Sequence, residues 1–514
     1  MGSHLGQDVV WFCILEYLVA EMLVGVFIVE ITCSALCSQQ CLHYQGVEIV
    51  KNDLSEAISY FESKNYNKAL SLFKQILKAE SSNEAAMYYT CLVYRALKKW
   101  SLCKSLAREY IKKHGRHWKV LEILGDVYEF EGDYRMARSL YKASLKRVGD
   151  EKEHQRILSK LQNCEKKTLE AKRKPKVALI VAEGTDNFTD DLLEKLSEHF
   201  WIKKVVIQKP ALLFYALLCK LVEKKVMKPS LCSVLIRIFP NSLKKAISWA
   251  QVIWIEWFSN LALLASYMPR RRGKKLFVRL HRYEAFTEYP LLANWKNIDG
   301  VVFVSDFMRE ILKMRGFDLQ KTNTKVIYNG IDISRFKFKQ RQKGYNIGLV
   351  AHIILRKNLH IAFEIIKKLA EKDARYKLHV AGSFDDLEYE IYLKHLVKTM
   401  GIESNVVFHG WIEDIEQWWE DKEYLLSTSI HESFGYNIVE AMAKGIKPII
   451  HNFFDAKELY DDQFLFSSID EAVENIVNGD YDSSYYREYV MKKGWTLEEQ
   501  ARKFETFIRE LMNS

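Results

Sequence analysis

The sequence contains few residues that interrupt regular structure, with 7 prolines and 22 glycines in 514 residues. This scarcity leaves little room for low-complexity linkers, and the 48% apolar, 13% aromatic and 28% charged composition is that of a globular protein. A chain of this length exceeds one compact core, so we expect about three domains.

Cysteine is also sparse, and all nine cysteines lie before residue 233. Their spacing does not resemble the disulfide framework of a secreted protein, so we expect a reducing, cytoplasmic environment. Cys33, Cys37 and Cys41 recur every four residues, as on one helix face. No flanking His or Cys completes a metal-binding spacing, and we therefore expect small buried residues here.

The chain lacks a strong excess of charge, because its net charge is +10. Its basic clusters, at residues 172–174 and 270–275, are short and separate. They favour solvated faces over contact with phosphate or an anionic membrane, and we expect no nucleic-acid partner.

Residues 9–37 are strongly apolar but are interrupted by Glu16, Glu21 and Glu30. A carboxylate at the centre of a membrane costs roughly 2.5–3.5 kcal/mol, which argues against a spanning helix. No basic segment or cleavage site indicates a signal peptide. For residues 1–50 we favour packing on the helices that follow. Peripheral contact with the inner face of a membrane and a non-native extension both stay open.

Residues 53–150 repeat with a period of 34, which predicts three tetratricopeptide-like helical hairpins. Small and aromatic residues recur in the same columns: Tyr60, Tyr94 and Tyr128; Ala57, Cys91 and Gly125; Ala69, Cys103 and Ala137; Tyr66, Trp100 and Tyr134; Phe73, Ala107 and Tyr141. A polar-faced helix over 151–171 would cap this array, which we place at 51–172. Its concave face would bind a protein or peptide partner, or brace the next domain.

After Pro175, short apolar runs alternate with helical stretches, which predicts parallel sheets. The expected strands are residues 176–182, 204–207, 252–255, 275–280, 300–304 and 325–328, then 346–350, 377–381, 405–408, 424–427 and 448–450. The fold class is therefore multidomain α plus α/β. Two Rossmann-like domains, 173–340 and 341–490, would enclose a ligand cleft. Residues 491–514 would form a helix that packs back across the cleft.

The strongest chemical signal is the stretch from His431 to Gly445, in which Glu432 and Glu440 stand eight positions apart. A small-aromatic-glycine turn separates them, and an Ala-Met-Ala helix follows. This order brings two carboxylates to either side of a helix start, whose backbone N–H groups attract anions. A sugar nucleotide has the matching shape, with hydroxyls at both ends and phosphates between them.

From about Lys176 onward, the chain resembles retaining glycosyltransferases of the group 1, family-4 type, which have the GT-B fold. The Glu-x7-Glu motif carries the resemblance, together with residues 326–332 followed by Phe336, and the loop that ends at Gly410. The resemblance implies transfer of a sugar from a nucleotide-diphosphate donor with retention of configuration. The family's usual route is a front-face, ion-pair-like transition state without a metal.

The resemblance also implies roles for residues of the second domain. Glu440 would bind the donor ribose and Glu432 would face the donor sugar. Lys357 would offset charge on the leaving diphosphate, and Gly410 would lie on the nucleobase side. The backbone that cradles the diphosphate would be that of Gly435, Tyr436, Asn437 and Ile438.

Other features concern the first domain and departures from the family pattern. His281 would face the reaction centre, donating to the sugar or pairing with Glu284. Where the family has Gly-Arg, this chain has Ala351-His352, so Arg356 is a candidate substitute near the phosphates. Tyr436 would reshape the sugar pocket. These departures concern the choice of donor more than the reaction class.

The resulting prediction is a cytoplasmic retaining glycosyltransferase with an N-terminal repeat array. It would use no metal and no cofactor beyond its donor, with a UDP-sugar favoured. The acceptor hydroxyl would belong to a protein or peptide, or to a lipid-linked or surface polysaccharide. Two alternatives are an inactive GT-B domain in a scaffold protein and a sugar-nucleotide epimerase of the same fold.

Overall fold

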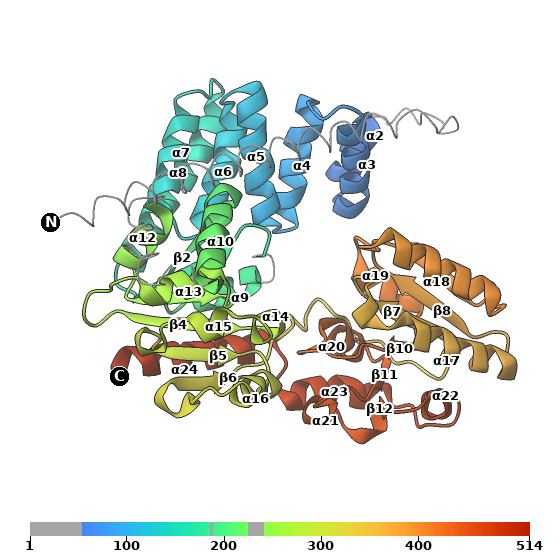
Figure 1. The fold of residues 1–514 in the computed structure, drawn as a ribbon. Helices are drawn as coiled ribbons and strands as arrows, with labels where there is room; N and C mark the ends of the chain where they lie inside the picture. The colour runs from blue at the N-terminus through green and yellow to red at the C-terminus, as the bar shows by residue number, and fades with distance from the viewer. Residues whose placement is uncertain (1–53, 186–188, 225–240) are drawn as a thin grey trace, which may run out of the picture. The chain divides into compact units, whose positions relative to one another are not determined.

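The computed structural model describes residues 54–185, 189–224 and 241–514. In these ranges an array of helices is followed by two α/β domains, each with a parallel six-stranded sheet (Figure 1). The expected order of fold classes is therefore confirmed. The predictions about residues 1–50, including the three cysteines spaced by four, lie outside the described residues.

The array consists of helices that pack in sequence order. They are α2 (Leu54–Glu62), α3 (Tyr66–Ala79), α4 (Glu84–Ala96), α5 (Trp100–His114), α6 (Trp118–Phe130), α7 (Tyr134–Leu145) and α8 (Glu151–Ala171). Helices α3, α5 and α7 begin 34 residues apart, so the sequence period is a structural period. The small residues Ala69, Cys103 and Ala137 are fully buried, as expected where two helices touch.

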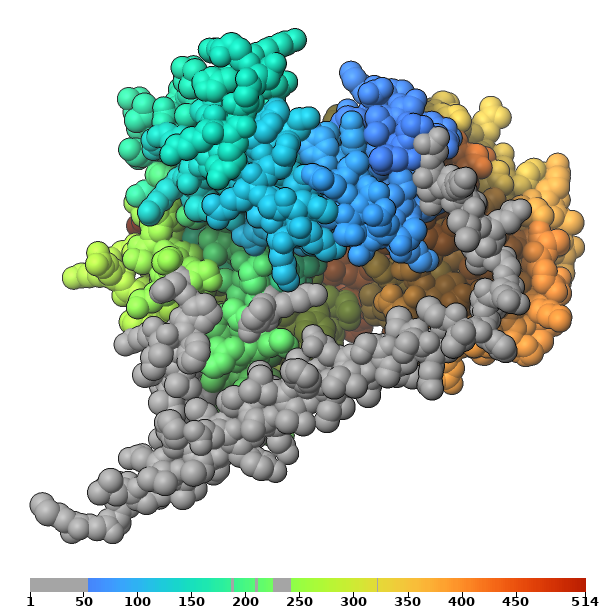
Figure 2. Space-filling view, turned by 90° about the horizontal axis from the view of Figure 1, so that it is seen from above, coloured from blue at the N-terminus to red at the C-terminus, as the bar shows by residue number. Residues whose placement is uncertain are grey.

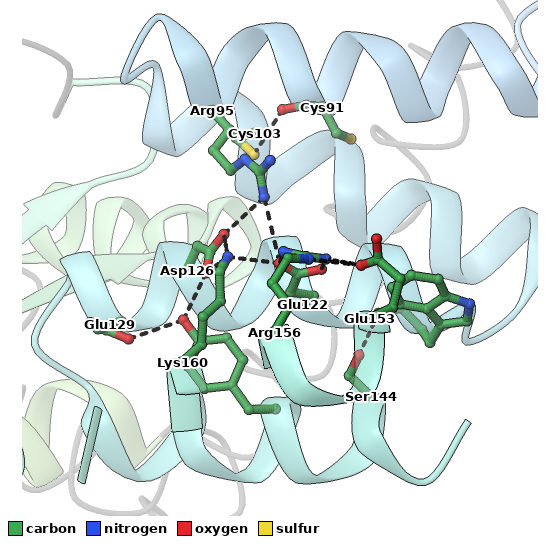
Figure 3. Close-up of polar contacts among 12 residues, drawn as sticks. Cys91, Arg95, Cys103, Glu122, Asp126, Glu129, Ser144, Glu153, Arg156 and Lys160 are labelled. Atoms are coloured by element: carbon green, nitrogen blue, oxygen red, sulfur yellow. Dashed lines mark hydrogen bonds and ion pairs between the residues drawn. The ribbon is translucent and has the colours of Figure 1, made fainter. Parts of the chain in front are cut away.

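A network of ion pairs links alternate helices of the array (Figure 3). Glu122 of α6 pairs with Arg156 of α8 at 2.5 Å, and Asp126 pairs with Lys160 at 2.7 Å. Both pairs join residues 34 apart, so equivalent repeat positions carry opposite charges. Burial would raise the pKa of Glu122, but its hydrogen bonds and charge interactions with Arg156 and Lys160 outweigh burial and lower it.

The first sheet has the strand order β2-β1-β3-β4-β5-β6. Its strands are β1 (Lys176–Ala182), β2 (Trp201–Ile207), β3 (Val252–Glu256), β4 (Lys275–Leu280), β5 (Gly300–Phe303) and β6 (Asn323–Val326). The helices are α9 (Asp190–Leu196), α10 (Lys209–Glu223), α12 (Asn241–Trp249), α13 (Asn260–Tyr267), α14 (Arg282–Ala285), α15 (Tyr289–Leu292) and α16 (Asp306–Met314). Strand order reverses between β1 and β3, which places a ligand crevice at their carboxyl ends.

The second sheet has the order β12-β11-β10-β7-β8-β9. Its strands are β7 (Asn346–Val350), β8 (Lys377–Ala381), β9 (Val406–Gly410), β10 (Tyr424–Ser427), β11 (Lys447–His451) and β12 (Leu465–Phe466). The helices are α17 (Leu359–Lys372), α18 (Leu387–Thr399), α19 (Ile415–Trp418), α20 (Tyr436–Ala443), α21 (Ala456–Leu459) and α22 (Ile469–Val477). Here the order reverses between β7 and β10, which gives a second crevice.

The chain crosses between the α/β domains twice, and the two crossings lie side by side. Ile331 N–H donates to the Trp495 carbonyl at 3.1 Å, and Leu497 N–H donates to the Ile331 carbonyl at 2.9 Å. A Cβ on Gly330 would lie 2.2 Å from the Thr496 carbonyl oxygen, so only glycine allows this close approach. The two crossings are therefore held together by backbone hydrogen bonds.

The segment 491–514, expected to be one helix, is divided between two. Helix α23 (Ser483–Lys493) ends at Gly494, and α24 (Leu497–Asn513) returns to the first domain. Phe504 of α24 stacks on Trp254 of β3, with ring centroids 4.7 Å apart. After leaving the second domain, the C-terminal helix α24 thus covers an apolar face of the first sheet.

Candidate functional site

A cavity of about 610 Å³ opens at the carboxyl ends of β7 and β10, facing the first domain. It is lined by Trp257, His281, Asn329, Val350, Ala351, His352, Lys357, Ala381, Gly382, Trp411, Ile412, Glu413, Ile415, Glu432, Ser433, Phe434, Gly435, Tyr436, Asn437 and Glu440. Its size and its mixture of apolar walls with a few polar groups are those of a small-molecule site.

Glu432 and Lys357 form an ion pair in this cavity. The loops after β7 and β10 carry them, and adjacency of these strands brings together residues 75 positions apart. Ser429 Oγ donates to Glu432 Oε1 at 2.7 Å, and Arg356 lies 3.9 Å from the other oxygen. Burial would raise the pKa of Glu432, but Lys357, Ser429 and Arg356 outweigh burial and lower it. Glu432 is therefore ionised at neutral pH.

The first turn of helix α20 lines the cavity, and its N-cap residue Gly435 has the left-handed backbone conformation that glycine favours. Gly435 has φ +75°, and a Cβ there would lie 2.8 Å from Ile438 Cδ1. The first N–H groups of a helix lack intrahelical partners. The N–H of Ile438 is already engaged by the Gly435 carbonyl at 3.0 Å. The helix start therefore offers the backbone of Tyr436 and Asn437 to a ligand, and these N–H groups favour an anion.

Glu440, one turn further along α20, lies on the same cavity wall. Burial raises the pKa of Glu440 to about 7. The negative charge of Glu416 also raises this pKa, whereas the positive charge of Arg335 lowers it. The two carboxylates of the motif therefore differ at neutral pH, since Glu432 is charged while Glu440 is near its midpoint. This difference arises because Glu432 has a cation in contact, whereas no cation of the described residues lies that close to Glu440.

His281 lines the cavity from the first domain, and its ring stacks on that of Trp257 with centroids 3.9 Å apart. Its Nε2 lies 2.7 Å from Glu256 Oε1. Burial lowers the pKa of His281, opposed by Glu256, so the imidazole is neutral with one N–H. That N–H is engaged by Glu256. The ring therefore pairs with the carboxylate of Glu256, while the carboxylate of Glu284 accepts from the His281 backbone N–H at 3.1 Å.

Glu256 is the centre of a buried polar network behind His281. It accepts from Arg279 Nη1 at 3.2 Å and from Trp254 Nε1 at 2.8 Å. Burial would raise its pKa, but Arg279 and His281 outweigh burial and lower it. Arg279 also donates to Asn329 Oδ1, which lines the cavity. The network fixes the orientation of His281 and connects it to the crossover between the domains.

The structure brings eight of the eleven predicted residues to the cavity: His281, His352, Lys357, Glu432, Gly435, Tyr436, Asn437 and Glu440. Arg356 lies beside it, with Nη1 donating to the His431 carbonyl at 3.0 Å. Gly410 does not line the cavity, but its carbonyl accepts from the N–H of the lining residue Gly382 at 2.7 Å. The side chain of Ile438 is fully buried in the core. His352 is at the rim, where its ring is 5.9 Å from that of Trp411.

Sequence reasoning missed several cavity residues that come from separate loops. Trp257 has φ +76°, a conformation that no sequence pattern reveals for a tryptophan. Trp411 and Glu413 follow β9, close to the loop that the resemblance singled out. Gly382 has φ +142°, and a Cβ there would lie 1.7 Å from the Ala351 carbonyl oxygen. For Gly382, the one available sequence signal was its place directly after an apolar strand run.

The arrangement suits a ligand with an anionic middle and hydroxyl groups. Lys357 and the α20 start supply positive potential, while Glu432 and Glu440 supply acceptors. Within the described ranges, no group of three or more His, Cys, Asp or Glu side chains is arranged to hold a metal ion. No helix in those same ranges is long and apolar enough to cross a membrane.

Comparison with known proteins gives a match that includes most of this cavity. Residues 330–475 match the family model described as glycosyl transferases group 1. This part of the chain is therefore a glycosyl transferases group 1 domain. It includes Lys357, Glu432 and Glu440 but not His281.

Two curated relatives match over shorter lengths. The mannosylfructose-phosphate synthase of Agrobacterium fabrum (strain C58) is 24% identical over 174 residues, covering 30% of this chain and 38% of the relative. The poly(ribitol-phosphate) alpha-N-acetylglucosaminyltransferase of Staphylococcus aureus (strain COL) is 24% identical over 172 residues, covering 33% of each. The chain thus spans only 33–38% of the length of these curated relatives.

A solved structure matches over a longer range. The crystal structure of Anabaena Alr3699/HepE in complex with UDP and glucose superposes with a TM-score of 0.51 and 18% identity. It covers 65% of this chain and 100% of that one. This likeness shows the fold of the two α/β domains.

Proposed function

We propose that the protein is a retaining glycosyltransferase that moves a sugar from a nucleotide-diphosphate donor to an acceptor hydroxyl. The observation that carries the proposal is the convergence of Glu432, Glu440, Lys357 and the α20 start on one cavity. The match of residues 330–475 to glycosyl transferases group 1 supports it. UDP is the favoured nucleotide because the solved structure with the same fold contains UDP.

In the proposed complex, the ribose hydroxyls donate hydrogen bonds to Glu440, and the diphosphate lies at the N-terminus of α20. Lys357 moves its ammonium group from Glu432 toward the phosphates, where it stabilises the departing charge. Glu432 then faces the donor sugar and stabilises positive charge at the anomeric carbon. His281 orders this side of the cavity through its stack on Trp257.

The proposed reaction occurs on one face of the sugar. The bond from the anomeric carbon to the diphosphate oxygen breaks, and a bond from that carbon to the acceptor oxygen forms on the same face. Because the new bond forms on the face from which the diphosphate departs, configuration is retained. The acceptor's proton passes to the departing diphosphate oxygen, so charge is balanced. The chain's own groups supply the positive potential, and we propose that no metal or further cofactor takes part.

The proposal also covers the acceptor, the helical array and the location of the protein in the cell. The acceptor hydroxyl belongs to a protein or a glycan, including lipid-linked glycans. The helical array is tetratricopeptide-like and contacts a protein partner. The protein acts in the cytoplasm, with peripheral contact to the inner face of a membrane where the acceptor requires it.

Donor turnover tests this proposal directly. The purified chain is incubated with UDP-sugars and hydroxyl acceptors, and the release of UDP and the anomeric configuration of the product are followed by NMR. We expect a product with the donor's configuration, and we expect Glu432→Gln to lower turnover at least about 100-fold. Tight donor binding without turnover across many acceptors would instead indicate a scaffold. Inverted product would contradict retention.

A further inference from the structure

A second cavity, of about 520 Å³, adjoins the first on the side of the first domain. It lies at the carboxyl ends of β1 and β3, where the strand order of the first sheet reverses. Thr185, Ser259 and Asn260 line it beside the strand ends, and helices α10, α14 and α15 supply most of its other walls. Trp257 lines both cavities, so they meet at the ring that stacks on His281.

The walls of this cavity are mainly apolar and aromatic. Helix α10 contributes Leu212, Leu213 and Ala216, and the short helices α14 and α15 contribute Tyr283 and Tyr289. Leu213 is 58% exposed and Tyr283 is 62% exposed. Large apolar side chains held at the edge of a cavity favour a ligand with an apolar surface.

The cavity also lacks positive charge, because its lining includes no Lys or Arg side chain among the described residues. Its one acidic residue, Glu284, is buried, and burial raises the pKa of Glu284 to about 8. At neutral pH that carboxyl group is mostly protonated. The cavity is therefore close to uncharged, in contrast to the neighbouring cavity with Lys357 and Glu432. A phosphorylated or otherwise anionic group would find no counter-ion in this described lining.

We propose that this second cavity binds an uncharged apolar group of the acceptor, such as an alkyl chain or an aromatic ring next to the hydroxyl that receives the sugar. The inference rests on the proposed function, which puts the donor in the first cavity. Trp257 would then separate the donor sugar from the acceptor's apolar group. Thr185, Ser259 and Asn260 would bind the polar part of the acceptor.

The test compares two uncharged glycosides that differ in their apolar group. n-Octyl β-D-glucopyranoside below its micelle concentration and methyl β-D-glucopyranoside are titrated calorimetrically into the full chain without nucleotide. We expect the octyl glycoside to bind at least about tenfold more tightly. Equal binding of the two glycosides would overturn the proposal.

A charged substitution at the edge of the second cavity tests whether the octyl glycoside binds there. Because Leu213 is largely exposed, Leu213→Asp should fold normally and weaken octyl glycoside binding at least about fivefold. Leu387→Asp is the matched control, since Leu387 is 71% exposed at the start of α18, outside the cavity. Octyl glycoside binding that Leu213→Asp leaves unchanged would also overturn the proposal.

UDP binding is measured on the same samples to separate this inference from the proposed function. We expect Leu213→Asp to bind UDP like the unmodified chain, because Leu213 does not line the first cavity. A chain that binds octyl glycoside but no nucleotide would refute the donor site while leaving the apolar cavity supported. A chain that binds UDP but neither glycoside would refute the apolar cavity alone.

Discussion

At the scale of single residues, the site's chemistry depends on how each carboxyl group is surrounded. Glu432 and Glu440 are the same residue type on one cavity wall, yet their pKa values move in opposite directions. The contact with Lys357 makes the difference. Each of the two carboxyl groups can therefore be tested by its own substitution.

The first prediction concerns the pair formed by Lys357 and Glu432. Lys357→Met leaves Glu432 without its contacting cation, although Arg356 and Ser429 remain. We expect the free energy of unfolding to fall by roughly 2 kcal/mol and turnover to fall about 100-fold. The double variant Lys357→Met/Glu432→Gln should recover most of the stability but no activity. Urea unfolding and turnover assays measure both, and a single variant as stable as the parent would contradict the argument.

The second prediction concerns pH and Glu440. Its pKa is raised to about 7 by burial, so the folded state holds this proton more tightly than the unfolded state does. The group's effect on stability is therefore increasingly unfavourable as pH rises from about 4.5 to 7. Because the carboxylate is the stronger acceptor, affinity for a UDP-sugar should rise as pH increases from about 6 to about 8.

Glu440→Gln is the control for that pH dependence. Its amide does not titrate, so affinity should be nearly independent of pH and about tenfold weaker at pH 8. A UDP-sugar is used instead of UDP because its phosphates are diesters and do not titrate in this range. Calorimetry at several pH values provides the measurement. The same pH dependence in both proteins would show that another group is responsible.

At the scale of elements, the start of α20 determines where the backbone donors point. Gly435→Ala combines an unfavourable left-handed conformation with a Cβ placed 2.8 Å from Ile438 Cδ1. We expect it to lower the free energy of unfolding by about 2–3 kcal/mol and to weaken UDP binding.

Gly401→Ala is the matched control for that variant. Gly401 has φ +70°, close to the +75° of Gly435, but a Cβ added to Gly401 would have nothing within 4 Å. The variant should therefore lose about 1 kcal/mol through backbone conformation alone and bind UDP normally. Urea unfolding and calorimetry compare the two variants. Equal effects of the two substitutions on UDP binding would contradict a specific role for the α20 start.

The elements were largely predictable from sequence, while much of the site was not. Apolar runs bounded by polar residues predicted eleven of the strands, and β12, with two residues, was too short to detect. Residues 432–440 are close in the chain, so their proximity in the folded protein could be predicted. Trp257 and Glu413 reach the cavity from loops after strands of different sheets. Their proximity depends on how the two domains pack, which local patterns do not encode.

At the scale of the whole described chain from Ala57 onward, the array contacts both α/β domains. On one side, the Glu131 carbonyl accepts from the Lys204 backbone N–H at 2.9 Å. On the other, Glu413 pairs with Lys74 at 2.6 Å and with Lys99 at 3.4 Å. Figure 2 shows the blue helices of the array next to the orange surface of the second domain. Since Glu413 lines the first cavity, the array touches the wall of the proposed donor site.

This contact predicts that the array influences donor binding. Glu413→Lys replaces two attractions by repulsions, and we expect affinity for a UDP-sugar to fall about threefold to tenfold at low salt. The triple variant Lys74→Glu/Lys99→Glu/Glu413→Lys restores opposite charges and should restore affinity. At 1 M salt, where the Debye length is about 3 Å, the differences should shrink. A triple variant as weak as Glu413→Lys would show that Glu413 acts through the ligand and not through the array.

In the proposed function, the cavity holding Glu432 and Glu440 binds the nucleotide of a sugar donor. The most direct measurement is calorimetric titration of UDP, GDP, ADP and CDP into the full chain and into Glu440→Ala. We expect one nucleotide, UDP, to bind selectively, and we expect the variant to lose most of this affinity while remaining folded. Binding of none of the four by a well-folded chain, or equal binding by the variant, would contradict the proposed function.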